Sequence, residues 1–211
     1  MAEISLNSAI TFVARLSFVL CSSLILVSCT GNRTAADSQL IFSDHFDSPS
    51  VGFEQQWFLE GTGNATFNGG RLQLQETPEG VGVVLWTKQD IPDSVSINFE
   101  IEFTENTCIG VFFFAAGHTQ GWPLEQTASE RTGEYDEYIR GDVNAYGLSL
   151  HRYWPDGRNN PGSNLRRNPG FHLLQQALPD PALESQTRYQ VEIEKRGAAI
   201  RVFVNGRLTH D

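Results

Sequence analysis

Apolar and polar residues alternate along most of the chain from Gln39 onward. The clearest case is residues 95–103, where Val95, Ile97 and Phe99 begin an apolar series interleaved with Ser, Asn and Glu. A period of two with one wet face is typical of strands in an antiparallel sheet. The same reading predicts further strands at residues 40–46, 57–59, 71–75, 81–86, 187–195 and 198–204, with one more after Asn205-Gly206.

Two longer runs in the middle of the chain complete the predicted sheets. Residues 108–116 are almost continuously apolar and predict a central strand covered on both faces, and residues 142–154 predict a long extended segment. A helical turn is expected only near residues 125–130, and the Gly-, Asn- and Pro-rich residues 155–169 predict a loop. Many short strands with regular turns indicate an all-β fold, a sandwich of two antiparallel sheets.

The N-terminal segment has the features of an export signal. An apolar stretch from Phe12 to Val27 is shorter than a membrane span and ends in Leu26-Val27-Ser28-Cys29, which resembles a bacterial lipobox. We therefore predict a signal peptide over residues 1–28, lipidation of Cys29, a polar tether over 29–38 and one domain over 39–211. Thr30 after the cysteine favours the outer membrane, and an ordinary secretory peptide is the alternative.

Composition limits the possible ligands. The net charge of −10 and the pI of about 4.9 argue against nucleic acid as a partner. Cys108 is the only cysteine left after export and lipidation, so no internal disulfide is expected. No zinc-type spacing or phosphate-binding glycine loop is present. No cofactor is expected; calcium is the one ion left open, on the strength of Asp44 and Asp47 alone.

Several longer motifs together resemble one family. They are FSDHFD, WFLEG, GRLQL, LWTKQDIPDSVSINFEIEF, GVFFFAA, RTGEYDEYIRGDVNAYGLSLHR, NLRRNPGF and YQVEIEKRGAAIRVFVNGRL. The pattern resembles the bacterial domain of unknown function 1961 family, within the concanavalin A-like lectin/glucanase superfamily. The resemblance implies a jelly-roll sandwich that commonly holds sugar on one sheet. It also implies closing strands beyond Asp211, so we expect this chain to lack its C-terminal strands.

Candidate chemistry concentrates between Glu134 and His172. Five acids lie at or just before its start: Glu125, Glu130, Glu134, Asp136 and Glu137. Five arginines follow: Arg140, Arg152, Arg158, Arg166 and Arg167. A basic cluster on an acidic protein predicts either ion pairs with the neighbouring acids or a site for an anionic ligand. Which face of the 142–154 strand is open cannot be decided from its alternation.

Three functions fit these residues. A polysaccharide lyase would neutralise a uronate carboxylate and move protons with Asn144, Tyr146, His151, Arg152, Arg166, Arg167 and His172. A glycoside hydrolase would use Glu134 and Asp136, which share a face, whereas Glu137 does not. A non-catalytic module would stack sugar rings on Trp122, Trp154, Tyr135 and Tyr138 and hold acidic groups with arginines. Asn168 is a further binding candidate, with a turn before Pro169 as the alternative.

The sequence therefore predicts an envelope-anchored protein that binds an anionic, uronate-type polysaccharide or oligosaccharide. Cleavage by a lyase or a hydrolase, binding alone, and a purely structural envelope role stay open as alternatives. The predicted partners are an anionic carbohydrate and, through the N-terminal lipid, the membrane.

Overall fold

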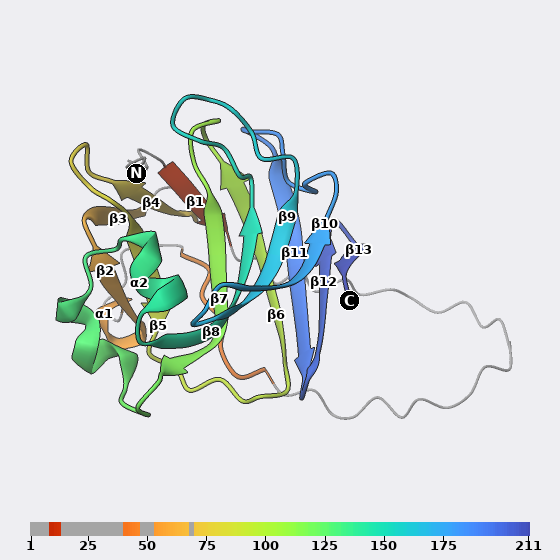
Figure 1. The fold of residues 1–211 in the computed structure, drawn as a ribbon. Coiled ribbons are helices and arrows are strands. Elements are labelled where there is room, and N and C mark those ends of the chain that lie inside the picture. The colour runs from red at the N-terminus through yellow and green to blue at the C-terminus, as the bar shows by residue number, and fades with distance from the viewer. Residues whose placement is uncertain (1–8, 14–39, 47–52, 68–69) are drawn as a thin grey trace, which may run out of the picture.

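Two antiparallel sheets pack face to face in a computed structural model that describes residues 9–13, 40–46, 53–67 and 70–211 (Figure 1). The larger sheet has the strand order β13-β12-β11-β6-β1-β4-β3. Its strands are β13 (Arg207–His210), β12 (Ala199–Val204), β11 (Arg188–Arg196), β6 (Val95–Phe103), β1 (Ala9–Val13), β4 (Leu72–Glu76) and β3 (Gly63–Phe67).

The second layer is made of shorter sheets. A four-stranded sheet has the order β10-β9-β8-β7, and β2 pairs with β5 in a separate ribbon. The bounds are β10 (His172–Ala177), β9 (Ser163–Asn168), β8 (Val143–Leu150), β7 (Gly110–His118), β2 (Trp57–Gly61) and β5 (Val83–Thr87). The helices are α1 (Phe53–Gln56), the 3-10 helix η1 (Leu124–Glu130) and α2 (Tyr135–Arg140), and the last two fall between β7 and β8.

The main core lies between the two sheets and follows the alternation of the strands. Ile101 and Phe103 of β6 are fully buried against Leu148 and Leu150 of β8, while Val191 and its neighbours on β11 fill the space beside them. Burial of this apolar surface is the main driving force for a sandwich of this kind. The predicted all-β fold of two antiparallel sheets is confirmed.

Most predicted strands are confirmed, β6 with the bounds that its alternation indicates, but β7, which was expected to be central, lies at the edge of the four-stranded sheet. Residues 40–46 are an exception, because the structure describes them without regular secondary structure. The prediction that residues 155–169 form a loop is wrong for β9, and β3, β10, α1 and α2 were not expected. Short polar strands such as β9 lack the apolar period on which strand prediction depends.

The N-terminal segment contributes one strand to the larger sheet. β1 pairs antiparallel with β4 on one side and with β6 on the other. It falls inside residues 1–28, for which the sequence predicts a signal peptide. Cleavage of this segment stays a prediction. Cys29 and the predicted tether lie outside the described residues. Among the described helices, none has the length and apolar character needed to cross a membrane.

The face of the four-stranded sheet turned away from the main core is called the outer face here. On β8 it carries Ala145, Gly147 and Ser149, whereas Leu148 and Leu150 point into the core. The alternation stops at His151, whose φ of 50° turns the chain at the end of the strand. The small side chains of β8 therefore floor the outer face.

Candidate functional site

Polar side chains cross the outer face on three neighbouring strands. Ser149 on β8 pairs with Asn164 on β9, which pairs with Gln176 on β10. The next row contains Gly147, Arg166 and Leu173. Since directly paired residues on adjacent strands project from the same side of a sheet, these rows stand together on the outer face. Asn164 is buried, although it is polar and belongs to a strand of mostly polar residues.

Two arginines, Arg152 and Arg166, meet at Asn164 and form what we call the arginine pair. The Asn164 carboxamide satisfies its neighbours when its oxygen accepts from Arg152 Nη1 at 3.1 Å and from Arg166 Nη2 at 3.3 Å. Arg152 Nη1 also donates to the Gly162 carbonyl at 2.8 Å, and Arg166 Nη1 donates to the Phe171 carbonyl at 2.8 Å. Two cations are thereby held side by side on neutral acceptors.

The arginine pair has no ion-pair partner among the residues that the structure describes, in contrast to two other arginines of the segment. Arg140 pairs with Asp136 at 3.3 Å, and Arg158 pairs with Asp156 at 2.7 Å, both at the surface. Burial lowers the pKa of both Arg152 and Arg166. The negative charge of Asp180 opposes this lowering at Arg152 without forming an ion pair, and half-buried positive charge is unfavourable unless an anion completes it.

Aromatic side chains surround the arginine pair. The guanidinium carbon of Arg166 lies 3.7 Å from the centroid of the Phe171 ring, and Tyr135 meets Phe171 edge-on at 6.0 Å. Burial raises the pKa of Tyr135, and the positive charges of Arg166 and Arg152 oppose this rise. One open depression is lined by these residues together with Ser149, Asn164 and Trp154. We call this part of it the groove; it offers positive charge, amide groups and rings.

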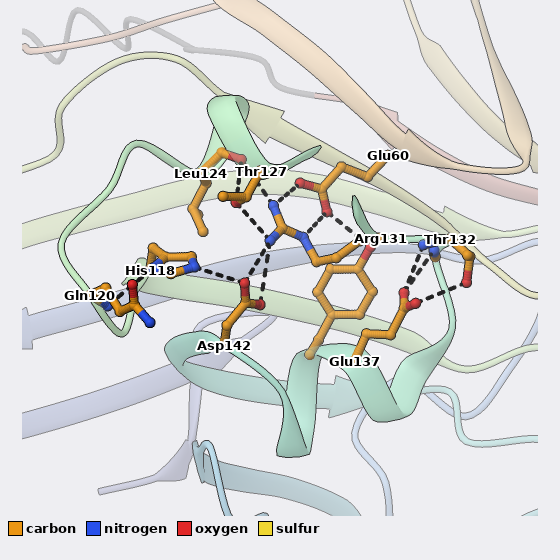
Figure 2. A network of polar contacts seen from close by, with 11 residues as sticks. Glu60, His118, Gln120, Leu124, Thr127, Arg131, Thr132, Glu137 and Asp142 are labelled. Atoms are coloured by element: carbon orange, nitrogen blue, oxygen red, sulfur yellow. Dashed lines mark hydrogen bonds and ion pairs between the residues drawn. The ribbon is translucent and has the colours of Figure 1, made fainter. Parts of the chain in front are cut away.

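A buried ion-pair network fixes the segment beside the groove (Figure 2). Arg131 lies on the loop between η1 and α2, and its Nε donates to Glu60 Oε2 of β2 at 2.9 Å while its Nη2 donates to Glu60 Oε1. The Tyr138 hydroxyl of α2 donates to Glu60 Oε2 at 2.9 Å, and Arg131 Nη1 donates to Thr127 at 2.9 Å. The hydrogen bond to Glu60 is the largest cause that raises the pKa of Arg131.

The network continues through Asp142 to the end of β7. Arg131 Nη1 lies 3.4 Å from Asp142 Oδ1, and His118 Nε2 lies 2.8 Å from Asp142 Oδ2. The other ring nitrogen of His118 accepts the backbone N–H of Gln120 at 3.0 Å. Both nitrogens of this buried imidazole are thus engaged. Arg131 and Glu60, which are 71 positions apart in the chain, were not among the residues predicted for the site.

The catalytic residues predicted for a lyase are not assembled on the outer face. Tyr146 lies on the opposite side of β8 and stacks on Phe114 of the main core at 5.6 Å. His151 is fully buried and stacks on Phe103 at 4.4 Å. Its ring nitrogens contact the carbonyl oxygens of Ala182 at 3.1 Å and Glu105 at 2.8 Å. The assignment of these two residues to proton transfer in the site is wrong, because both are packed into the interior.

Of the predicted binding residues, Arg152, Arg166 and Tyr135 come together in the groove, and three others point elsewhere. Arg167 pairs with Tyr146 and with His172 across the strands, on the side opposite Arg166. Asn144 is exposed and lies on the Tyr146 side of β8. A ligand that binds the arginine pair cannot also contact these side chains across the sheet.

Asn168 lies on the outer face but is covered. It pairs with Ala145, is 2% exposed, and its Oδ1 has no hydrogen-bond partner in the described part of the chain. The adjacent Gly170 N–H donates to Ile139 of α2 at 2.8 Å, which holds this turn against the helix. Asn168 therefore supports the groove from below α2 and does not line it.

The carboxylates expected for a hydrolase both border the depression, but they are not alternate residues of one strand. Residue 134 precedes α2 and Asp136 lies in its first turn, and helical residues two apart point in different directions. Asp136 is engaged with Arg140 on the surface. Tyr138, a predicted sugar-stacking residue, is 1% exposed, and burial raises the pKa of its hydroxyl. Both predictions assumed an extended segment where the chain is helical.

The suggested calcium position gains no support from Asp44. Its Oδ1 accepts the Phe46 N–H and its Oδ2 accepts Trp57 Nε1, both at 2.8 Å. Such bonds are those of a turn-forming aspartate. Asp47 lies outside the described residues. Within residues 40–46, 53–67 and 70–211, no group of three or more His, Cys, Asp or Glu side chains is placed to hold a metal ion.

Comparison with known proteins agrees with this architecture. YesU of Bacillus subtilis (strain 168), an uncharacterized protein, is 29% identical over 157 residues, which cover 72% of this chain and 71% of YesU. A crystal structure of a Bacillus subtilis protein of unknown function with a galectin-like fold matches with a TM-score of 0.66 and 27% identity, over 76% of this chain and 74% of that one. The model of the family described as Domain of unknown function (DUF1961) matches residues 39–210, so the chain belongs to the DUF1961 family.

Proposed function

We propose that the protein binds an acidic carbohydrate of the uronate type in the groove, with a sugar carboxylate held by Arg152 and Arg166. The observation that carries this proposal is the arginine pair itself, two half-buried guanidinium groups bridged by Asn164 and without an ion-pair partner in the described chain. Guanidinium groups bind planar carboxylates through paired, charge-assisted hydrogen bonds.

The surroundings of the arginine pair suit a sugar. Gln176 adds an amide group on the same face as the buried Ser149 and Asn164, and Tyr135, Phe171 and Trp154 add aromatic surface. Sugars offer hydroxyl groups and apolar ring faces to such a mixture of polar and aromatic side chains. A galectin-like fold in a solved relative supports carbohydrate as the ligand class.

Binding of uronate oligosaccharides, followed by isothermal titration calorimetry, tests this proposal. Arg152→Ala and Arg166→Ala should each weaken binding roughly ten- to hundredfold, because a hydrogen bond to a charged group contributes about 1.5–3 kcal/mol. Arg167→Ala is the matched control: it removes the same charge from the next residue, on the opposite side of β9. Equal loss in Arg166→Ala and Arg167→Ala, or equal affinity for the carboxyl-reduced neutral sugar, would contradict the proposal.

The proposal includes attachment to the bacterial envelope through a lipid on Cys29, after a cleavage that removes residues 1–28 and with them β1. The motif Leu26-Val27-Ser28-Cys29 supports it, and Thr30 supports the outer membrane as the destination. The lipid would place the groove beside polysaccharides at the cell surface. Incorporation of a labelled fatty acid by the wild type, and its loss in Cys29→Ser, is the expected result; unlabelled wild-type protein in the aqueous fraction would contradict it.

A further inference from the structure

An exposed tryptophan lies on a second part of the depression that contains the groove. Trp122 is 52% exposed and lines the depression together with Gly121 and Pro123. The start of η1 at Leu124 also borders it, and so does the chain from Gly133 to Tyr135. Half of this aromatic surface is in contact with water, so a ligand that covers it would gain binding free energy from burial.

The indole of Trp122 is held flat. It stacks on the His118 imidazole with ring centroids 4.9 Å apart and 17° between the planes. The imidazole itself is buried, its Nε2 donates to Asp142 at 2.8 Å, and its Nδ1 accepts from the Gln120 N–H at 3.0 Å. One face of the indole is thus backed by a ring that cannot turn, and the exposed part of the side chain remains available.

The support extends into the buried network shown in Figure 2. Asp142 contacts Arg131, and Arg131 is joined to Glu60 by two hydrogen bonds in which both side chains are almost completely buried. A binding surface costs less conformational entropy when its aromatic side chain is already fixed before the ligand arrives. These contacts give the exposed indole such a preorganised position.

From these contacts we infer that Trp122 is a stacking platform for a second sugar ring, and that the ligand is an oligosaccharide which reaches from the arginine pair to Trp122. The inference rests on the function proposed above, since it assumes that one acidic sugar occupies the arginine pair. Trp122 binds the ring of another unit through its apolar face, while His118 is a positioning residue that acts through the indole.

The inference predicts a dependence on ligand length. Calorimetric titration with galacturonate, its trimer and its hexamer should show tighter binding of the longer ligands by the wild type. Trp122→Ala should weaken hexamer binding about three- to tenfold and leave the monomer within about twofold, since a stacked aromatic contact contributes on the order of 1 kcal/mol. His118→Phe, which keeps a ring beneath the indole, should retain more of the hexamer affinity than His118→Leu.

The outcomes separate this inference from the proposed function. Hexamer binding that is unchanged in Trp122→Ala, or weakened equally for monomer and hexamer, overturns the stacking platform. If Arg152→Ala and Arg166→Ala still lose affinity in that case, the arginine pair remains the binding site. Absence of any uronate binding by the wild type overturns both proposals, and equal behaviour of His118→Phe and His118→Leu overturns the positioning role of His118.

Discussion

Arg166 lies over the ring of Phe171 and is also bonded to the backbone of that residue. The guanidinium carbon is 3.7 Å from the ring centroid, and Nη1 donates to the Phe171 carbonyl at 2.8 Å. Phe171, the last residue of the turn between β9 and β10, therefore holds the arginine through both its ring and its backbone. The remaining N–H groups of Arg166 are directed by this contact toward Asn164 and the groove.

Phe171→Leu should weaken binding of a uronate oligosaccharide about two- to fivefold, because a cation–π contact at a partly exposed site contributes about 0.5–1 kcal/mol to the position of the arginine. Calorimetric titration measures the change. Phe203→Leu is the control, since Phe203 lies under Arg201 at 5.8 Å on the larger sheet, away from the arginine pair. Equal effects of the two substitutions would show that the contact at Phe171 has no special role.

Arg131→Met should lower the free energy of unfolding by about 3–5 kcal/mol, because it leaves the buried Glu60 carboxylate without its counterion. Urea unfolding followed by circular dichroism measures this. Arg140→Met removes an exposed i,i+4 pair with Asp136 and should cost less than about 0.5 kcal/mol. The double variant Glu60→Gln with Arg131→Met should lose less than Arg131→Met alone; a larger loss would contradict the stated cause.

Glu76 makes stability depend on pH. Burial raises the pKa of this carboxyl from 4.5 to about 7, and its Oε1 has no hydrogen-bond partner in the described chain. Between pH 4.5 and 7 the folded state then binds more protons than the unfolded state, so stability falls as the pH rises through this window. After allowance for solvent screening the loss should be about 1–2 kcal/mol, complete above pH 7.

Glu76→Gln should remove that component of the pH dependence. The variant should be more stable than the wild type at pH 8.5, and this advantage should shrink as the pH falls toward 4.5, where the wild-type carboxyl is protonated in the folded state and half protonated in the unfolded state. Thermal unfolding at a series of pH values gives the comparison. The exposed Glu79→Gln serves as the control. A constant difference between wild type and Glu76→Gln across this range would refute the assignment.

His151→Leu should lower the free energy of unfolding by about 1–3 kcal/mol, because the hydrogen bond that the imidazole donates to one of the two carbonyls it contacts, Ala182 or Glu105, is lost in the interior. The affinity of the folded variant for uronate oligosaccharides should remain within about twofold of wild type, since the imidazole is buried on the core side. Urea unfolding and calorimetry on the same preparation separate the two effects. A large loss of affinity in fully folded protein would return His151 to the binding site.

The strands that the sequence predicts well are those with one apolar face, and β6 is the clearest example. β9 was read as a loop because Ser163, Asn164, Arg166 and Arg167 give it no apolar period, although its partners in the sheet bury most of it. A basic cluster could be predicted from the sequence, but not which of its arginines form the pair. Neighbouring arginines 166 and 167 point to opposite sides of the sheet, so only the strand register separates them.

The wrong predictions for individual site residues also have local causes. Alternation alone sends His151 to the outer face with Ser149, but the positive φ at His151 ends the strand and turns its ring into the core. Tyr138 and Asp136 lie in α2, a helix that the sequence does not predict. Glu60 and Arg131 carry no sequence signal at all, because an ion pair between distant segments depends on the whole fold.

The buried network draws its members from β2, η1, α2 and the ends of β7 and β8. Because these segments are far apart in the chain, the segment beside the groove can be fixed only after the sheets have packed together. In a partly folded chain, the segment beside the arginine pair would therefore not be fixed. For this reason we expect only the native state to bind the ligand with full affinity. Saturating oligosaccharide should accordingly protect the whole domain against heat, with an increase in midpoint that follows ligand concentration.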